Sequence, residues 1–365
     1  MKINLIFFLS EFNLGGAGNS VFKLCKNLSK NQFIISVICL NKCFYKEELN
    51  KSGIQVFEVK SRKTIFAMTE IKRIVKKLIS NKYKKNIFIS NIYYSNILSI
   101  LFLRSLKMKI VLVERTPFKE LSIYYNFVDL IKKIIIKILI KFTFLKADMC
   151  VSNSKLISKD YNKYYNLNFK TIYPPSFNKS VQFNNKNINK KKTICIGTVC
   201  RLSREKGIFE FFKIIPELKE KILFKIIGKG PEKNKLIKLS KNLKINKKIK
   251  FLGFKKPSEI KSAMKKFDIY LNCSHFEGFP NTAVEALSIG KPVIASQSYG
   301  GINEIIKKKN YGLIYKNNGE LINILNKIIE KKIRFNIKKK EIYSHLSSFN
   351  EYNNLKKYTK LFEEI

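Results

Sequence analysis

Short runs of Ile, Val and Phe alternate with segments of helix length along the first half of the chain. Each run is apolar throughout rather than at every second position, and each is too short to be a helix of its own. Continuous apolar strands joined by helices are typical of a parallel sheet that is covered on both faces. The expected strands are 3–8, 33–40, 54–59, 86–90, 109–114 and 148–152.

A polar stretch with two prolines, residues 171–192, interrupts this alternation and is typical of a linker. The alternation then restarts with apolar runs at 193–199, 222–228, 249–254, 268–274 and 292–296. We therefore predict an α/β chain of two Rossmann-like parallel-sheet domains that face a central cleft, where such folds bind ligands. The predicted parts are a first domain over 1–175, a linker over 176–192, a second domain over 193–340 and a helical tail over 341–365.

The chain is strongly basic, with 72 Lys and Arg against 26 Asp and Glu and a formal net charge of +46. Such a surface attracts phosphorylated substrates, anionic lipids or nucleic acid, although a compositional bias of the genome explains the excess equally well. An apolar content of 45% in 365 residues indicates folded domains and not a disordered chain.

Seven cysteines without a CxxC pair, together with only two histidines, do not favour structural zinc and favour a reducing compartment. The apolar N-terminus is about one strand long and is followed by a glycine-rich turn. We therefore expect a buried first strand there and not a signal peptide.

Three glycine-containing loops follow expected strands and open expected helices. In the first loop, Gly15, Gly16 and Gly18 allow close approach of a ligand to the backbone, and the helix N-terminus favours negative charge. An ordinary tight turn explains the first loop equally well. The third loop, with Gly228 and Gly230, either borders a nucleotide base or is a packing turn.

The second loop begins in the segment that opens with Gly197 and carries Arg201 and Lys206 five residues apart before a helix. Two cations beside a helix N-terminus suit a diphosphate, because Arg binds two oxygens at once and Lys adds a point charge. A chance pair in so basic a chain is the alternative.

The segment 274–296 places Glu277 in a loop and Glu285 eight residues later, in the expected first turn of the helix that follows. A carboxylate only accepts hydrogen bonds, so it suits adjacent sugar hydroxyls. Backbone N–H groups of the turn from Gly278 to Thr282 can meet phosphate. We expect this loop beside Arg201 and Lys206.

These segments resemble the retaining, NDP-sugar-dependent glycosyltransferases of family 4, which have the GT-B fold, and the resemblance covers nearly the whole chain in order. It implies a ribose contact for Glu285, a donor-sugar contact for Glu277, and diphosphate contacts for Arg201 and Lys206. It also implies that Gly16 lets its loop close over the diphosphate, that the C-terminal helix crosses back onto the first domain, and that neither metal nor cofactor is needed.

Retention in that family requires no obligatory enzyme nucleophile, so the two glutamates are not interpreted as a hydrolase acid/base pair. The predicted catalytic residues are Glu277, Arg201 and Lys206. The predicted donor contacts are Gly16, Gly197, Gly228, Gly278, Phe279, Pro280, Asn281, Thr282 and Glu285.

The acceptor side departs from many relatives, which have a His after the fourth strand. This chain has the sequence SNIYYSN over 90–96, and VERTPF over 113–118. Both pieces partly resemble relatives that build glycans on lipid carriers, which implies acceptor contacts for Asn96, Glu114 and Arg115. A buried strand end with a satisfied ion pair is the alternative.

The segment 127–148 has Lys133, Lys137 and Lys141 at four-residue spacing among Ile and Leu. Lysine interrupts it too often for a membrane span. A basic amphipathic helix of this kind lies on anionic membrane surfaces. A helix of the first domain whose lysines face water is the alternative.

The sequence thus predicts a retaining hexosyltransferase that uses an NDP-sugar, most simply a UDP-hexose or UDP-N-acetylhexosamine. The predicted acceptor is a lipid-linked saccharide or lipopolysaccharide precursor at the cytoplasmic face of the cell membrane. An epimerase or phosphorylase of the same architecture is one rival. A nucleic-acid-binding protein is another, although the basic residues are scattered and no nucleic-acid motif occurs, so no nucleic-acid partner is expected.

Overall fold

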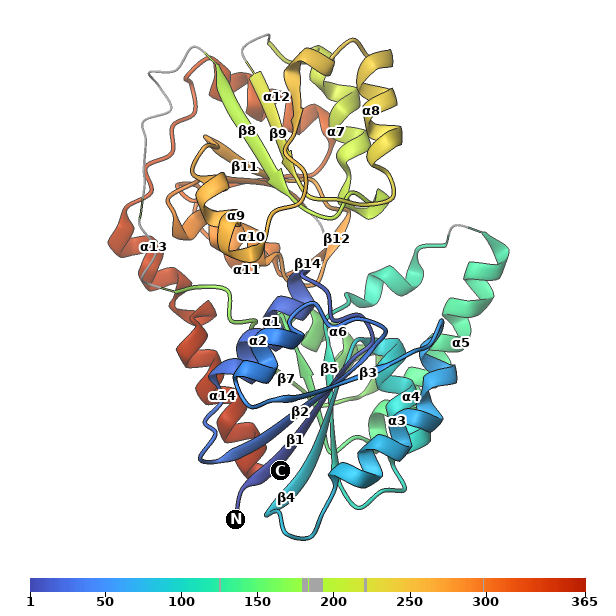
Figure 1. Cartoon of the computed structure of the whole chain (residues 1–365). Helices are drawn as coiled ribbons and strands as arrows, with labels where there is room; N and C mark the ends of the chain where they lie inside the picture. Colours follow the sequence, from blue (N-terminus) through green and yellow to red (C-terminus); the bar gives the residue numbers. More distant parts are fainter. Residues whose placement is uncertain (125, 179–182, 184–192, 220–221, 298) are drawn as a thin grey trace. The chain divides into compact units, whose positions relative to one another are not determined.

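The computed structural model describes residues 1–124, 126–178, 183, 193–219, 222–297 and 299–365. They form two compact units, the first made of Met1–Pro175 with Glu351–Ile365 and the second of Ser176–Asn350 (Figure 1). Most of the expected linker, 179–182 and 184–192, lies outside the described residues.

The first unit is built on a seven-stranded parallel sheet in the order β3-β2-β1-β4-β5-β6-β7. All six expected strands are present, and the seventh has only three residues, too few to stand out in the sequence. The strands are β1 (Ile3–Leu9), β2 (Phe33–Leu40), β3 (Gln55–Val59), β4 (Lys85–Asn91), β5 (Lys109–Glu114), β6 (Met149–Ser152) and β7 (Phe169–Thr171).

Helices cover both faces of this sheet, because alternate residues of each apolar strand point to opposite sides. In β1, Leu5 and Phe7 belong to one apolar core and Ile6 and Phe8 to the other. The helices are α1 (Gly16–Asn27), α2 (Lys46–Lys51), α3 (Thr64–Leu78), α4 (Tyr93–Leu103), η1 (Phe118–Ser122), α5 (Phe127–Thr143), η2 (Phe144–Lys146), α6 (Lys155–Tyr165) and α14 (Glu351–Glu364).

The C-terminal tail is two helices and not one. The first, α13 (Lys339–Leu346), and the turn η7 (Ser347–Phe349) belong to the second unit. The chain is extended at Asn350, and α14 then packs on the first unit beside α1, where the ring of Phe362 meets that of Phe7 edge to face at 6.3 Å (Figure 1). The helix that packs on the first unit therefore begins ten residues after the expected start at 341.

The second unit repeats the same plan with a six-stranded parallel sheet in the order β10-β9-β8-β11-β13-β15. Its strands are β8 (Ile194–Val199), β9 (Ile222–Ile227), β10 (Ile249–Phe251), β11 (Ile269–Asn272), β13 (Val293–Ser296) and β15 (Gly312–Tyr315), with a small extra pair β12 (Phe276–Glu277) and β14 (Tyr299–Gly300). Its helices are η4 (Arg204–Lys206), α7 (Ile208–Ile214), η5 (Ile215–Glu217), α8 (Lys233–Asn242), η6 (Asn246–Lys248), α9 (Pro257–Met264), α10 (Asn281–Ser288), α11 (Ile302–Ile305), α12 (Asn318–Ile329), α13 and η7.

Both sheets therefore have a doubly wound order in which the direction of winding reverses beside the first strand. Ligands of such sheets bind outside the carboxyl ends of the strands at this reversal. In the second unit the reversal lies between β8 and β11, and in the first between β1 and β4. These two places fix where a site is expected.

Helix α5 differs from the expectation for 127–148. Its regular part ends at Thr143, and the predicted stripe of Lys133, Lys137 and Lys141 is not its outer face. The Lys133 side chain is only 12% exposed and forms an ion pair with Asp129 at 3.0 Å. No helix in the described part of the chain is long and apolar enough to cross a membrane.

Candidate active site

The loops after β8 and β11 touch at the reversal point of the second unit. Gly207, which ends the turn η4, has a φ of +66°, and a Cβ atom there would lie 1.9 Å from the carbonyl oxygen of Cys273. Only glycine permits both this conformation and this approach. The close packing holds Lys206, the neighbour of Gly207, against the loop that follows β11.

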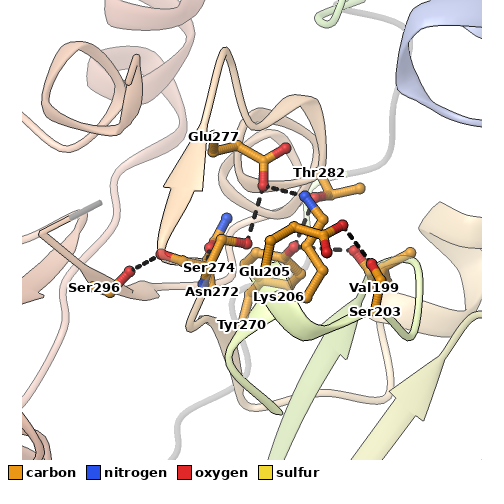
Figure 2. A network of polar contacts seen from close by, with 10 residues as sticks. All are labelled: Val199, Ser203, Glu205, Lys206, Tyr270, Asn272, Ser274, Glu277, Thr282 and Ser296. Carbon is orange, nitrogen blue, oxygen red and sulfur yellow. Dashed lines mark hydrogen bonds and ion pairs between the residues drawn. The ribbon is translucent and has the colours of Figure 1, made fainter. Parts of the chain in front are cut away.

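Lys206 and Glu277 form the centre of the polar network shown in Figure 2. The lysine Nζ lies 2.7 Å from a carboxylate oxygen of Glu277, and the Ser274 hydroxyl donates to the same oxygen at 3.0 Å. The two charged side chains are 17% and 22% exposed. Burial lowers the pKa of Lys206, but the carboxylate of Glu277 outweighs it and the net pKa is raised, so the lysine stays charged.

The backbone around Glu277 is fixed by the short pair of strands β12 and β14. Gly300 has a φ of +145°, and a Cβ atom there would lie 1.4 Å from the carbonyl oxygen of Glu277. The N–H of Gly301 donates to the carbonyl of Gly278 at 3.0 Å. The glutamate is thus held on a rigid turn rather than on a mobile loop.

The carboxylates of Glu277 and Glu285 both lie near the buried hydroxyl of Tyr270. Burial raises the pKa of Tyr270, and the charges of Glu277 and Glu285 raise it further. The hydroxyl shares a hydrogen bond of 2.6 Å with that of Thr282 (Figure 2). One expectation was wrong: α10 begins at Asn281, so Glu285 is its fifth residue and lies beyond the first turn.

Four of the predicted donor contacts are packing residues in the structure. Phe279 and Pro280 are buried, and the Phe279 ring meets that of Phe349 at 5.1 Å. A Cβ atom at Gly197 would lie 2.2 Å from the Phe267 ring, and one at Gly228 would lie 1.9 Å from the carbonyl oxygen of Cys200. These four residues are therefore in close contact with neighbouring segments of the second unit. Asn281 accepts a hydrogen bond from the Ser176 hydroxyl at 2.7 Å.

Arg201 is exposed just after β8, and its side chain has no hydrogen-bond or ion-pair partner among the described residues. It does not join the network of Lys206 and Glu277. Within the described part of the chain, no side chain competes for its guanidinium group.

Sequence reasoning missed Ser274, Tyr270 and the Ser203–Glu205 pair beside Lys206. The Ser203 hydroxyl hydrogen-bonds to the Glu205 carboxylate within the turn that carries the lysine (Figure 2). Their identities carry no distinctive pattern. Their position in the sequence relative to the predicted strands was the available indication. All of them lie in strand β11 or in the loops at the carboxyl ends of β8 and β11.

In the first unit, the glycine-rich loop after β1 is an open turn. The Asn13 side chain accepts from the N–H of Gly15 at 2.9 Å, and Gly16 is exposed at the start of α1. The first turn of α1 has no acidic residue. That this loop closes over a diphosphate stays a prediction.

The predicted acceptor residues gather at the carboxyl ends of β4 and β5. Glu114 is fully buried and accepts from the backbone N–H groups of Arg115 and Thr116, each at 2.9 Å. Asn96 lies 3.4 Å from the same carboxylate, and the Arg115 Nε donates to Asn91 at 3.1 Å. Burial raises the pKa of Glu114 to about 7, although the two backbone donors oppose this. Among the described contacts, Arg115 meets Glu114 through its backbone N–H and not through a direct ion pair.

The backbone is strained close to these residues, at the carboxyl end of β4. Ile92, between β4 and α4, has a φ of +73°, which is rare for a β-branched residue. Its N–H donates to the carbonyl of Val113 at 2.9 Å, so the turn is tied to β5. Such strain persists only where the surroundings over-determine it, and it is frequent at ligand sites.

Solved structures that contain two parallel sheets of this kind share the fold of this chain. The protein HepE of Anabaena, solved with UDP-glucose, aligns with a TM-score of 0.80 at 17% identity, covering 99% of this chain and 100% of HepE. Sucrose-phosphate synthase of Thermosynechococcus elongatus aligns with a TM-score of 0.82 at 13% identity, covering 100% and 99%. The chain has the GT-B fold of glycosyltransferases.

The family follows from the sequence. Residues 178–360, half of the chain, match the family described as glycosyl transferases group 1, and the chain belongs to it. An uncharacterized glycosyltransferase of Methanocaldococcus jannaschii is 26% identical over the whole chain and 99% of its own length. A Campylobacter jejuni enzyme, named as an N-acetylgalactosaminyltransferase acting on a diphospho-undecaprenol-linked saccharide, is 26% identical over 59% of this chain and 58% of its own. The protein is a glycosyltransferase.

Described residues contain no group of three or more His, Cys, Asp and Glu side chains placed to hold a metal ion.

Proposed function

We propose that this glycosyltransferase moves a sugar from a UDP-sugar to a lipid-linked saccharide, with retention of the anomeric configuration. The observation that carries the proposal is the Lys206–Glu277 pair, 2.7 Å apart and mostly buried, at the winding reversal of the second unit. A fixed cation at that position of a doubly wound sheet suits a diphosphate.

The leaving group determines what these residues must do. The bond between C1 of the sugar and the β-phosphate oxygen breaks, a bond from C1 to the acceptor oxygen forms, and the acceptor's hydroxyl proton passes to the departing diphosphate. Negative charge grows on that diphosphate. Lys206 and Arg201 would stabilise it, and Glu277, held by Lys206 and Ser274, would accept hydrogen bonds from the donor sugar.

The uridine part of the donor is supported by two comparisons. HepE was solved with UDP and with UDP-glucose, and the pneumococcal transferase GtfA with UDP and GlcNAc. Glu285, near Tyr270 on α10, is the carboxylate proposed to accept from the ribose hydroxyls.

The proposal of a lipid-linked acceptor is supported by residues of the first unit. Asn96, Glu114 and Arg115 gather beside the strained Ile92, at the carboxyl ends of β4 and β5 and next to the reversal point of that sheet. The Campylobacter jejuni relative named above acts on an undecaprenol-linked saccharide, and an Escherichia coli relative is named for O-antigen biosynthesis. We accordingly propose a lipid-linked acceptor at the cytoplasmic face of the cell membrane.

The test is a transfer assay with a panel of UDP-sugars and an undecaprenyl-diphosphate-linked saccharide, preceded by thermal unfolding with each donor. One donor should protect the protein and yield a product whose new linkage has the donor's anomeric configuration by NMR. A parallel incubation without acceptor detects epimerisation, and a second with EDTA tests the expectation that no metal is needed. Protection by no UDP-sugar, or inversion at C1, would contradict the proposal.

A further inference from the structure

Helix α5 exposes a continuous row of large apolar side chains on the outside of the first unit. Eight of them are between 44% and 74% exposed. We call them the α5 ridge: Phe127, Val128, Ile131, Ile134, Ile135, Ile138, Phe142 and Leu145. Figure 1 shows α5 beside α4 at the margin of the first unit, so the helix is anchored by one side only.

The spacing of the ridge shows that it is a single face. At about 100° per residue, the seven positions within α5 fall within an arc of about 120°, and Leu145 follows in the turn η2. The opposite side of the helix is buried through Ile136, Ile140 and Thr143. Such a helix has two apolar faces, one for the core of the unit and one for something outside it. A contiguous exposed apolar surface of this kind usually marks an interaction site.

Lysines border the ridge on both sides. Lys132 lies at one edge of the arc and Lys141 at the other, and both are exposed, as is Lys146 just beyond the end of α5. The only carboxylate in the helix, Asp129, is turned away and bound to Lys133. The exposed charged side chains of α5 that border the ridge are therefore all positive.

The remaining lysines of the predicted stripe are occupied within the unit. The Lys133 Nζ donates to the carbonyl of Ile123. The Lys137 Nζ reaches the hydroxyls of Ser122 and Tyr124 at 3.1 and 3.2 Å and lies over the Phe118 ring at 5.6 Å. They hold the preceding segment against α5 and are poor candidates for contact with an outside surface.

We propose that the α5 ridge inserts into the interface of a membrane containing anionic lipids, with Lys132 and Lys141 at the headgroups. Apolar side chains on one face of a helix enter the boundary between headgroups and acyl chains, and adjacent lysines add attraction to anionic lipid. The contact is thus mainly apolar, in contrast to the lysine stripe expected from the sequence.

A second copy of the chain fits the same surface poorly. Two ridges packed face to face would bring the positive margins of both copies together, with no exposed carboxylate on α5 to offset them. An anionic lipid surface supplies the missing negative charge. The inference deepens the proposed function, because it rests on a membrane-bound acceptor and names the element that would meet that membrane.

The experiment compares the parent with the ridge variant Ile131→Gln/Ile135→Gln/Ile138→Gln in vesicle sedimentation. Glutamine preserves helix propensity while removing the apolar surface. The matched control, Phe44→Gln/Phe66→Gln/Tyr352→Gln, removes exposed aromatic side chains from other elements of the same unit. Vesicles are phosphatidylcholine alone or with about one third phosphatidylglycerol, over a salt series. Thermal unfolding with and without UDP verifies that each variant is folded.

We expect the parent and the control to bind the anionic vesicles, and the ridge variant to bind at least tenfold more weakly at every salt concentration. A second variant, Lys132→Gln/Lys141→Gln, should bind more weakly than the parent at low salt and equally well at high salt. The reason is that salt screens the attraction between these lysines and the anionic lipids. Vesicle binding by the ridge variant equal to that of the parent would overturn the proposal. The proposal would also be overturned if the parent does not bind vesicles but sediments as a dimer, while the ridge variant sediments as a monomer.

Failure of this inference and failure of the proposed function are separable. If the ridge is right and the function wrong, vesicle binding falls selectively while the parent transfers no sugar to the lipid-linked acceptor. If the function is right and the ridge wrong, the ridge variant keeps full transfer to acceptor presented in vesicles. If both are right, the variant loses transfer in vesicles at least tenfold but keeps it on acceptor dispersed in detergent.

Discussion

The substitution Lys206→Met should lower the catalytic rate strongly while lowering the stability of the fold less. The methionine keeps most of the apolar stem and removes the ammonium group that lies 2.7 Å from Glu277. If that ammonium group stabilises charge on the leaving diphosphate, its loss removes about 3–4 kcal/mol of transition-state stabilisation, or about 100- to 1000-fold in kcat. Stability should suffer less, because Glu277 keeps the Ser274 hydroxyl as a donor, and one hydrogen bond to a charged group is worth about 1.5–3 kcal/mol.

The assay is release of UDP at saturating donor, with thermal unfolding of the same preparations. The matched control is Lys213→Met, which removes an exposed lysine from α7 in the same unit and should leave kcat unchanged. A Lys206→Met enzyme with kcat within twofold of the parent would refute the role of the lysine. A variant that unfolds before assay is replaced by Lys206→Arg, which keeps the charge and should fold but place it differently.

Three further predictions concern the donor, the diphosphate and pH. Glu285→Ala should weaken UDP binding by at least tenfold in calorimetry, because ribose hydrogen bonds to a carboxylate are lost; unchanged affinity excludes the ribose role. Arg201→Ala should lower kcat at least tenfold while leaving the unfolding temperature unchanged, since its side chain is exposed. Burial raises the folded-state pKa of Glu114 from 4.5 to about 7. The folded chain thus keeps a proton that the unfolded chain loses, and stability should fall by about 3 kcal/mol as pH rises from about 4.5 to about 7. Glu114→Gln should show no such decline in denaturant titrations.

Strand positions in both units were predictable because they depend on continuous apolar runs. All eleven runs identified in the sequence overlap strands of the two sheets. Four strands were not predicted: β7, β12, β14 and β15. They are two to four residues long and have no apolar run that distinguishes them from loop sequence. Such strands exist because a neighbouring strand supplies their hydrogen bonds, which is information about the fold and not about the segment.

The candidate site was predictable in location but not in its contacts. The order of strands and loops indicated that Lys206 and Glu277 would come together, and they form an ion pair. The sequence could not show that Phe279 faces Phe349, because residues 70 positions apart meet only in the folded unit. Glu285 was expected in the first turn of α10 but lies just beyond it, because the helix begins directly after Pro280, at Asn281.

Helix α5 shows how periodicity can mislead. The regular spacing of Lys133, Lys137 and Lys141 suggested a charged outer face. Apolar residues are so frequent in this helix that they form two faces, and the sequence does not reveal which one the unit buries. Lysines at the boundary then bind nearby oxygens or extend to solvent, according to which neighbours the fold supplies.

The most direct measurement of where the donor binds is hydrogen–deuterium exchange of the whole chain with and without UDP. The second unit places Lys206 and Glu277 in contact, with Glu285 on the adjoining helix α10. UDP should therefore slow exchange in peptides covering 197–207 and 274–288, and in few others of that unit. Slowed exchange that is absent from both segments, although UDP binds, would contradict the assignment of the site to the reversal point between β8 and β11.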